Sequence, residues 1–372
     1  MDFSFTDEQQ MLLDTTRRFL AERYGFEQRQ RIRDSDAGWS REIWTQLGEL
    51  GLLALNIPEA EGGIGGGPVA TLLVGTSIGA GLLVEPYGSS AVVATEALVQ
   101  LGAPAQRAHW LPLLASGECI AVLAHDEAGE GTATGALATT AVRNAQGWEI
   151  SGQKSIVYHA PAADVLLVSA RTEEGTGLFL VASGAEGLSL QRYRTIDDQC
   201  AADVVLDKVT VSAEAKLGAE VSEGLQQVLD IGLAALCAEA LGAMERILAA
   251  TIEYSRSRTQ FGAPIGSFQA LQHRMAEMLM HLEQARSMCY LAATRCSDTD
   301  AAARAAALSA AKVLMGQAAR YIGQQAVQLH GGMGMTDELD VSHYFKRLLA
   351  FELRCGTTEA HLERYRGLLQ AA

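Results

Sequence analysis

The chain has 372 residues, a length that allows two or three domains around a large buried core. Hydrophobic residues make up 48% and charged residues 20%, the balance of an ordinary globular protein, and the net charge is -15. Because Lys and Arg must outnumber acids on surfaces that bind nucleic acid or anionic membrane, this charge argues against both as main partners. A local basic pocket for a phosphate-bearing ligand stays open.

The sequence shows no targeting or membrane signal. Met1–Phe5 lacks the basic and apolar regions of a signal peptide. The longest apolar stretches lie around Ala91–Leu98 and Leu233–Leu241, and residues such as Glu239 keep them short of the roughly 18 residues that a spanning helix needs. We therefore expect a cytoplasmic protein without a membrane segment.

Neither the cysteines nor the histidines form a ligand pattern. The six cysteines contain no CxxC pair, which favours reduced thiols in a large core over a disulfide framework or a zinc site. The eight histidines show no HExxH or comparable spacing, so we expect no metal. The cysteines are Cys119, Cys200, Cys237, Cys289, Cys296 and Cys355.

The predicted elements run helix-rich, strand-rich and helix-rich, which indicates a mainly α protein with a central β-domain. We predict an N-terminal helical domain at 1–118, a middle β-domain of barrel or sandwich type at 119–217, and a C-terminal helical bundle at 218–372. Thr6 and Gln9 form a capping box before the first helix. Ser40 caps a second helix, which Gly51 ends.

The middle segment carries short β-favouring runs, and Asn144–Gly147 is predicted as a hairpin turn between two of them. The predicted strands are Ile120–Ala124, Thr139–Arg143, Trp148–Ile150, Ser155–Tyr158, Val165–Val168, Leu178–Val181 and Val204–Val211. Beyond them, alanine-rich stretches with a 3.6-residue apolar period predict bundle helices. These helices are Glu223–Arg256, Phe268–Cys296, Asp300–Leu329, Asp340–Phe351 and Thr358–Leu369.

Two glycine patterns imitate known motifs without their context. Gly75–Gly79 matches the nucleophile elbow of α/β-hydrolases, which needs a strand before it, but here it lies in helical material. Gly62–Gly67 loosely resembles a phosphate cradle, but it lacks the Lys-Ser/Thr of a P-loop and a preceding strand. We expect close helix packing at the first and a flexible helix connection at the second.

A tight loop between two long predicted helices carries the most distinctive cluster, which begins at Arg258. That arginine offers planar, bidentate pairing to a phosphate. Gln260 and Gln269 offer amide donors and acceptors for an adenine or a ribose, and Phe261 offers a ring face. On spacing alone, a helix connection with a solvated arginine is the favoured interpretation.

Two glycine turns follow this loop. In Gln328–Thr336 the paired glycines permit positive φ and close backbone approach to a ligand, although a glycine that ends a helix explains them as well. In Cys355–Glu359 a glycine turn opens a helix, where Thr357 either donates to an anion or caps that helix.

Taken in this order, the motifs resemble the acyl-CoA dehydrogenase family. The match is an Arg-x-x-Phe-Gly-x-x-Ile-x-x-Phe-Gln loop, a Gln-x-x-Gly-Gly-x-Gly turn and a Gly-Thr turn near the C-terminus. Trp148–Lys154 looks like the middle-domain hairpin of the family, and Asn56–Gly63 and Leu111–Glu118 fit its N-terminal pattern. The resemblance spans nearly the whole chain and implies the family fold, with a four-helix C-terminal bundle.

The resemblance also implies FAD, bound between the β-domain and the bundle, with its adenine end reaching a neighbouring subunit. The implied contacts to adenine, ribose and pyrophosphate are Arg258, Gln260, Phe261 and Gln269, the implied flanking residues are Gln328, His330, Gly331 and Gly332, and Thr357 is implied near the flavin. The implied activity is α,β-desaturation of an acyl-CoA thioester. The implied partners are an electron-transferring flavoprotein and further subunits, either identical copies or a second acyl-CoA dehydrogenase chain.

This chain departs from the family at the catalytic base. Removal of the α-proton of a thioester requires a carboxylate, and the β-hydride then passes to the flavin. The glutamate of the family precedes the Gly-Thr turn, where this chain has Cys355, and a neutral thiol replaces it only with a strongly lowered pKa. The alternative position on the first bundle helix falls at Gly232, with Asp230 two residues away as a fallback.

The β-domain departs as well. The aromatic and threonine that lie beside the flavin in the family map near Ile156 and Tyr158. The Glu-Pro-Gly-x-Gly loop of the family is degraded to Asp126–Gly131. These changes bear on catalysis more than on the fold.

Four hypotheses follow. The first is a base-lacking subunit that completes FAD sites in a heteromer, as the small subunit of pimeloyl-CoA dehydrogenase-type heteromers does by resemblance. The second is a self-sufficient enzyme whose base is Asp230 or an unaligned acid. The third is a non-catalytic flavoprotein or architectural subunit, and the fourth is altered chemistry, such as a carbon–sulfur lyase acting on an acyl-CoA.

Overall fold

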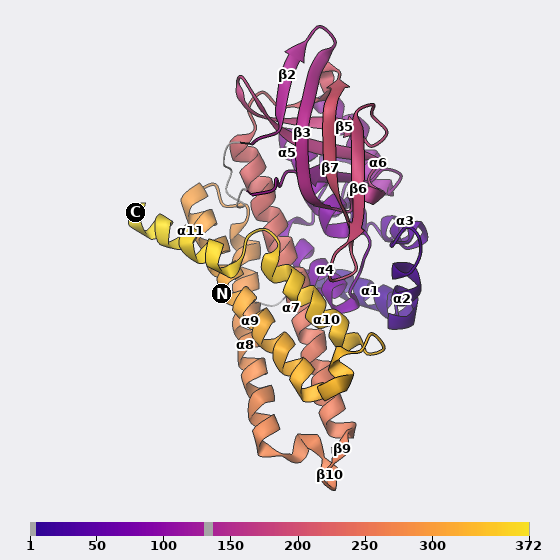
Figure 1. The fold of residues 1–372 in the computed structure, drawn as a ribbon, viewed down its shortest axis with the longest axis vertical. Helices are drawn as coiled ribbons and strands as arrows, with labels where there is room; N and C mark the ends of the chain where they lie inside the picture. Colours follow the sequence, from indigo (N-terminus) through magenta and orange to yellow (C-terminus); the bar gives the residue numbers. More distant parts are fainter. Residues whose placement is uncertain (1–4, 130–136, 372) are drawn as a thin grey trace. The chain divides into compact units, whose positions relative to one another are not determined.

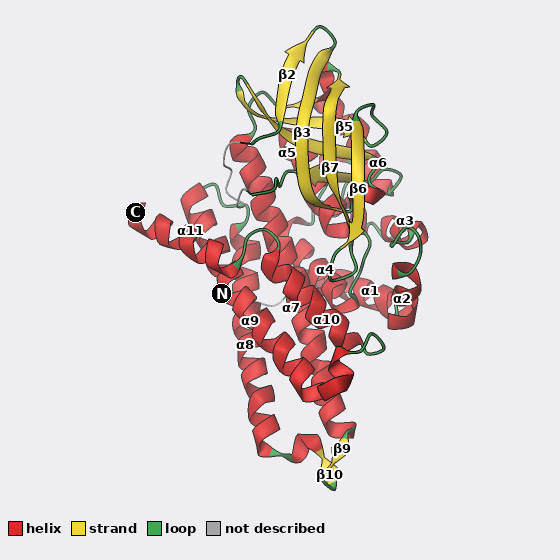
Figure 2. Ribbon diagram, viewed as in Figure 1, coloured by secondary structure: helices red, strands yellow, loops and turns green. Residues whose placement is uncertain are grey.

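The computed structural model describes residues 5–129 and 137–371, which are mainly helical with a central β-domain, as predicted (Figures 1 and 2). These residues form two compact units that alternate along the sequence. Unit 1 contains the residues up to Gln30, then Pro68–Leu83, then those from Leu233 onward. Unit 2 contains Arg31–Gly67 and Val84–Gly232.

The helices of the N-terminal third begin and end where local signals predict. The Thr6 hydroxyl accepts from the Gln9 amide at 3.2 Å while the Gln9 side chain accepts from the Thr6 amide at 3.1 Å, which confirms the capping box. Ser40 accepts from the Ile43 amide at 3.3 Å, and Gly51 has a φ of 76° after the helix end. These helices are α1 (Asp7–Arg23), α2 (Phe26–Arg33), α3 (Arg41–Glu49), α4 (Gly67–Gly81), α5 (Thr95–Leu101) and α6 (Pro104–Ser116), with a π-helical turn at Tyr87–Ala94.

Unit 2 contains an eight-stranded sheet in the order β6-β7-β3-β2-β4-β5-β8, with β1 parallel to β4. The β2–β4 link is parallel and is made at Thr140 and Arg171, so two antiparallel halves meet at one narrow joint. The strands are β1 (Ala121–Ala124), β2 (Thr140–Asn144), β3 (Gly147–Tyr158), β4 (Val165–Thr172), β5 (Gly175–Ala182), β6 (Leu188–Arg194), β7 (Cys200–Val211) and β8 (Lys216–Leu217).

Two strand predictions need correction. Trp148–Ile150 and Ser155–Tyr158 are one strand, β3, because Lys154 between them is fully buried with a counter-charge, so the ladder continues through a polar stretch. Strand β6 was not predicted, since its residues are mostly exposed and lack a buried alternating face. The predicted hairpin turn is confirmed by the pairing of Asn144 with Gly147.

The core of unit 2 lies where the sheet meets the helices of the same unit. Helix residues such as Leu98 and Leu111 pack with strand residues such as Leu167 and Leu178, and all four are fully buried. Burial of a leucine side chain contributes about 2 kcal/mol, so this cluster holds the strands against α5 and α6. Figure 2 shows these two helices beside the strands.

The C-terminal part of the chain forms the predicted bundle, in which α8, α10 and α11 all pack on α9. The five helix predictions hold to within two residues at each end. The elements are α7 (Ser222–Ser257), α8 (Gln269–Arg295), α9 (Ala301–His330), α10 (Asp340–Leu353) and α11 (Thr358–Ala371), with a small hairpin of β9 (Thr259–Gln260) and β10 (Ala263–Pro264) between α7 and α8.

Small residues let α4 approach α7 within unit 1. A Cβ at Gly79 would lie 1.8 Å from the Glu239 carbonyl oxygen, and a Cβ at Gly242 would lie 1.8 Å from the Thr76 carbonyl oxygen. Ser77 of the apparent nucleophile elbow is buried in the middle of α4 and donates to the Leu73 carbonyl at 3.0 Å. The helix-packing interpretation of Gly75–Gly79 is confirmed.

The Gly62–Gly67 loop of unit 2 is not a phosphate cradle. Its amides bind carbonyls of its own unit: Ile64 donates to Ala54 at 3.1 Å, Gly65 to Ile57 at 2.9 Å and Gly66 to Leu55 at 2.9 Å. A Cβ at Gly63 would lie 2.1 Å from the Ile57 carbonyl oxygen, so the loop is closely packed. The predicted flexible connection is thus a packed one.

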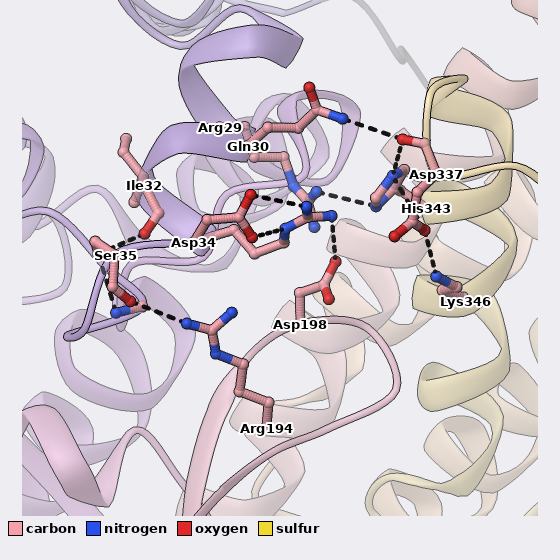
Figure 3. A network of polar contacts seen from close by, with 12 residues as sticks. Arg29, Gln30, Ile32, Asp34, Ser35, Arg194, Asp198, Asp337, His343 and Lys346 are labelled. Carbon is pink, nitrogen blue, oxygen red and sulfur yellow. Dashed lines mark hydrogen bonds and ion pairs between the residues drawn. The ribbon is translucent and has the colours of Figure 1, made fainter.

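A buried arginine ties α2 to α10 within unit 1 (Figure 3). Arg29 is 1% exposed, its Nε donates to the Leu82 carbonyl at 3.0 Å, and its Nη1 lies 3.2 Å from Nδ1 of His343. Nε2 of His343 lies 3.0 Å from the Asp337 carbonyl oxygen. An imidazole that donates to that carbonyl leaves Nδ1 as the acceptor for the guanidinium, so one ring joins Arg29 to the Asp337 backbone.

Helix α7 is the one helix in the described part of the chain that is long and apolar enough to cross a membrane, and 72% of its apolar window is buried inside the protein. That burial is typical of a core helix in a bundle. The sequence-based expectation that acidic residues keep every apolar stretch too short to span a membrane is therefore wrong for α7, whose length and composition would allow a span. Most of the apolar surface of α7 packs against other parts of the same chain.

The close α4–α7 contact predicts that a single methyl group added at Gly242 strongly lowers the stability of the fold. Gly242→Ala places a Cβ against the Thr76 backbone, which cannot yield without separating the helices, so we expect the free energy of unfolding to fall by about 2 kcal/mol or more. Urea denaturation measures this loss. The control is Gly367→Ala on α11, where a Cβ meets nothing within 4 Å and a gain of up to about 1 kcal/mol is expected.

Candidate functional site

The Arg258 loop is a two-residue β-hairpin at the end of the long helix pair α7 and α8 (Figure 1). Thr259 pairs with Pro264 and Gln260 with Ala263, while Phe261 and Gly262 form the turn with φ of 55° and 79°. Two successive positive φ values define a type I′ turn, which glycine accepts at no cost but phenylalanine does not. The strained Phe261 backbone presents its ring outward.

The side chains of this loop are open. Phe261 is 94% exposed. Its ring meets the ring of Phe268 edge to face, with the two ring centroids 6.3 Å apart. Gln269 is exposed at the first turn of α8. Among the residues that the structure describes, none offers a side-chain partner to the exposed Arg258 guanidinium, and the Gln260 amide donates to the neighbouring Thr259 carbonyl at 2.8 Å.

The paired glycines end α9. Gly331 adopts φ 61° and ψ -141°, a combination that only glycine adopts readily, and its amide donates to the Gln328 carbonyl. A Cβ at Gly331 or Gly332 would meet nothing within 4 Å, so packing inside the described chain does not require either glycine. The side chain of Gln328 is exposed. This turn therefore leaves its backbone open to an external group.

Two aromatic rings, one from α7 and one from the end of α9, stack beside these two segments. The sequence motifs include His330 but not its partner Tyr254. Tyr254, one helical turn before Arg258, stacks on His330 with ring centroids 4.3 Å apart, and its hydroxyl lies 3.5 Å from the His330 carbonyl oxygen. His330 is 4% exposed and its Nδ1 lies 2.8 Å from the Ala326 carbonyl oxygen. Burial lowers the pKa of His330. The side chain of His330 thus serves the chain's own packing.

The Cys355–Gly356 turn is held by a buried lysine. Lys312 of α9 is fully buried, and its ammonium donates to the carbonyls of Phe351 at 3.0 Å, Glu352 at 3.1 Å and Gly356 at 2.8 Å. Three carbonyl acceptors satisfy the three ammonium protons, which offsets the cost of burying the charge. Burial nevertheless lowers the pKa of Lys312.

Further contacts from α9 surround the turn. His361 Nε2 lies 2.7 Å from the Cys355 carbonyl oxygen, while its Nδ1 lies 3.3 Å from Ser309 Oγ. Burial disfavours the ionised Glu352, but the Arg320 guanidinium at 2.6 Å and the Thr358 hydrogen bonds outweigh it and lower the pKa. His361 of α11 thus holds the Cys355 carbonyl, and Arg320 of α9 holds the Glu352 side chain near the end of α10.

Thr357 caps α11, since its hydroxyl accepts from the Ala360 amide at 3.2 Å. The capping interpretation of Thr357 is confirmed by this contact. The hydroxyl proton remains available to a ligand, because a hydroxyl donates and accepts at once. The two interpretations offered for this residue are therefore compatible.

None of the three positions considered for the catalytic base has an exposed carboxylate. Cys355 is exposed at the tip of its turn with a φ of 53°. At Gly232 a Cβ would lie 2.8 Å from a Val93 methyl group, so the glycine permits close packing in unit 2. Asp230 is 2% exposed and accepts from the Gln226 side chain at 3.0 Å along its own helix.

In the β-domain, a buried ion pair anchors the degraded loop. Lys154 is fully buried, and its ammonium donates to Glu127 at 2.7 Å, to the His125 carbonyl at 3.1 Å and to Ser169 at 3.1 Å. Glu127 also accepts from the amides of Ala138 and Thr139 at 2.6 and 3.1 Å. One carboxylate therefore joins Lys154 of β3 to the amides of Ala138 and Thr139 just before β2. The Glu130–Gly131 end of the predicted loop lies outside the described residues.

The residues that map beside the flavin lie at the end of β3. Ile156 is 53% exposed and Tyr158 is half-buried. The bulge at Ile156 lies next to the anchored loop, because the Ser155 amide donates to the Asp126 carbonyl at 2.8 Å. Unit 2 thus brings together the two β-domain segments in which the sequence departs from the family.

Comparison with known proteins decides the family. Residues 6–118, 123–209 and 224–366 match the N-terminal, middle and C-terminal domain models of acyl-CoA dehydrogenase. Acyl-CoA dehydrogenase FadE27 of Mycobacterium tuberculosis is 30% identical over 334 residues, which are 88% of this chain and 87% of that protein. The chain belongs to the acyl-CoA dehydrogenase family.

Solved structures give the same fold. The ChsE4-ChsE5 complex from Mycobacterium tuberculosis matches with a TM-score of 0.93 at 28% identity, covering 100% of both chains. A variant of the Tcur3481-Tcur3483 steroid ACAD matches with a TM-score of 0.90 at 30% identity, covering 98% of both chains. As an acyl-CoA dehydrogenase family member, the chain is an FAD-type oxidoreductase acting on CH–CH bonds.

The described residues fit this cofactor. Among the described residues, none packs against a Cβ at Gly331 or Gly332 and none pairs with the Arg258 guanidinium, while Phe261 is nearly fully exposed. Amide donors, a bidentate phosphate partner and a ring face are groups that can bind a dinucleotide. Packing within the described residues does not explain the positive φ of Phe261 or the exposure of its ring, whereas a bound dinucleotide would explain both.

The Glu127–Lys154 pair predicts a pH-dependent loss of stability. Burial acts to raise the pKa of Glu127, but hydrogen bonds from Lys154 and from backbone amides outweigh it and lower the pKa to about 2. Because the folded pKa is lowered, the contribution of Glu127 is full above about pH 4.5 and is lost as the pH falls toward 2. We expect Glu127→Gln to cost about 3 kcal/mol at pH 7, since Lys154 loses its counter-charge.

Denaturation of both proteins between pH 7 and pH 3 measures this difference, which should shrink as the solution becomes acidic. Glu174→Gln is the control, because Glu174 is 63% exposed where it pairs with Lys216, and its loss should cost less than about 1 kcal/mol. A difference that stays constant with pH would contradict the ion-pair account.

Proposed function

We propose that this chain is an FAD-binding acyl-CoA dehydrogenase subunit that lacks its own catalytic base and works in a heteromer with a second acyl-CoA dehydrogenase chain. The observation that carries the proposal is Cys355, an exposed thiol at the base position on a turn held by Lys312 of α9 and His361 of α11. A protonated thiol has no basic site for a carbon-bound proton. The second chain would therefore supply the carboxylate.

The proposed cofactor contacts follow from the open groups of the chain. Arg258 would bind the pyrophosphate, with Gln260, Phe261 and Gln269 at the adenine and ribose. Gln328 and the amides of Gly331 and Gly332 would flank the same dinucleotide, and Thr357 would donate near the flavin. When bound, FAD would supply the acceptor for the β-hydride. His330 would act through its ring stack, which fixes the glycine turn that follows it.

The partners in the proposal rest on chemistry and on similarity. The similar structures ChsE4-ChsE5 and Tcur3481-Tcur3483 each pair two differently named chains, which supports a heteromer. The substrate would be an acyl-CoA thioester and the electron acceptor an electron-transferring flavoprotein, in the cytoplasm. The division into domains at 1–118, 119–217 and 218–372 also stays a proposal.

The pyrophosphate role of Arg258 is tested by FAD retention. Arg258→Ala removes two charge-assisted hydrogen bonds, so we expect FAD affinity in the complex to fall about 10- to 100-fold. Arg258→Lys should recover only part of the lost FAD affinity, because an ammonium keeps the positive charge but lacks the planar fork of the guanidinium. Gel filtration followed by flavin absorbance measures the FAD retained per chain. Arg256→Ala is the control, and an equal loss in both would refute the role.

The missing base is tested by restoring it. We expect Cys355→Glu, loaded with FAD, to bleach its flavin on addition of an acyl-CoA, while Cys355→Gln of nearly equal shape does not, because only the carboxylate accepts the α-proton. Anaerobic absorbance at the flavin band follows the reaction. If FAD-loaded Cys355→Glu does not bleach, the base is not the only missing part, and the non-catalytic alternative stands.

A further inference from the structure

Strand β3 carries a bulge near its end. The pairing of β3 with β7 shifts between Lys154, opposite Val204, and Val157, opposite Ala202. Two residues of β3, Ser155 and Ile156, therefore face the single residue Asp203 of β7. A bulge of this kind redirects a side chain and is common next to active sites.

The bulge is strained at Ile156. This residue has a φ of 50°, which is an outlier for a β-branched side chain and is energetically unfavourable. His159, three residues further on, also has a left-handed φ of 62°. The strain at Ile156 does not serve the core, because its side chain is 53% exposed. A strained backbone that presents an apolar side chain outward has a reason only if that side chain meets another group.

Asp203 holds this conformation. Its Oδ1 accepts from the Ile156 amide at 2.9 Å and from the Tyr193 hydroxyl at 2.8 Å. Burial and the neighbouring carboxylate raise the pKa of Tyr193 to about 12, so the phenol stays a donor at neutral pH. Both bulge amides thus leave the ladder: Ile156 binds a side chain of β7, and Ser155 binds the Asp126 carbonyl.

We propose that Asp203 is a positioning residue for the cofactor: its carboxylate fixes the β3 bulge so that Ile156 is presented to the flavin. The inference rests on the proposed function, because only the family resemblance maps Ile156 beside the flavin. Tyr193 supports Asp203 from β6 as the second hydrogen-bond partner. A looser bulge would let Ile156 relax to an ordinary strand conformation and turn away.

The test compares four forms of the FAD-loaded protein, in the complex where a partner chain is needed. Asp203→Ala removes both hydrogen bonds, while Asp203→Asn keeps an acceptor oxygen for them. Asp207→Ala is the matched control, since Asp207 lies on the same strand, is exposed and has no side-chain partner among the described residues. The readouts are the FAD dissociation constant, the absorption spectrum of the bound flavin and hydrogen exchange of the Ile156 amide.

We expect Asp203→Ala to weaken FAD binding at least about tenfold, to shift the bound flavin spectrum and to speed exchange of the Ile156 amide. Asp203→Asn and Asp207→Ala should match the original chain in all three. If Asp203→Ala does not fold, Tyr193→Phe removes one hydrogen bond only and should move the spectrum in the same direction.

Faster exchange at Ile156 with unchanged FAD affinity and spectrum would overturn the inference and leave the proposed function intact. If the original protein binds no FAD even with partner chains, the proposed function fails and this inference fails with it. The two failures are therefore distinguishable.

Discussion

The buried ammonium of Lys312 determines what the C-terminal turn can do. It binds three carbonyls around the junction of α10 and α11, while His361 of α11 holds the Cys355 carbonyl and Arg320 of α9 holds the Glu352 side chain. Loss of any carbonyl would leave an ammonium proton buried without an acceptor, which is expensive, so the turn has one low-energy position. The location of residue 355 is fixed by this contact, and only the identity of its side chain is free to decide the chemistry.

Three strained and exposed positions lie in the segments proposed to meet the cofactor. Phe261, Ile156 and Cys355 all have positive φ without being glycine, and all three are exposed. Each is held by nearby rigid contacts, respectively the β9–β10 hairpin, Asp203 and the Lys312 network. Such conformations persist only where the surroundings over-determine them, which is common at ligand sites. The helices and the sheet supply that rigidity, and the exposed residues face outward for partners.

Local signals made much of this fold predictable. The caps at Thr6 and Ser40 and the 3.6-residue periods located the helices closely, because these signals act within a few residues. Strand β3 was split because Lys154 looks like an exposed residue until Glu127, 27 positions away, is brought beside it. Lys312 has the same character, since its acceptors are backbone carbonyls about 40 residues away. Tyr254 carried no motif, and only the helix packing reveals its stack on His330.

We propose above all that the chain carries the cofactor groups of an acyl-CoA dehydrogenase but not the base. Incubation of the FAD-loaded chain alone with an acyl-CoA in heavy water tests it directly, because a base exchanges the α-proton whether or not hydride transfer follows. We expect no deuterium at the α-carbon with this chain alone, and incorporation when a base-bearing partner chain is added. Deuterium incorporated at the α-carbon by the purified chain alone would contradict the account.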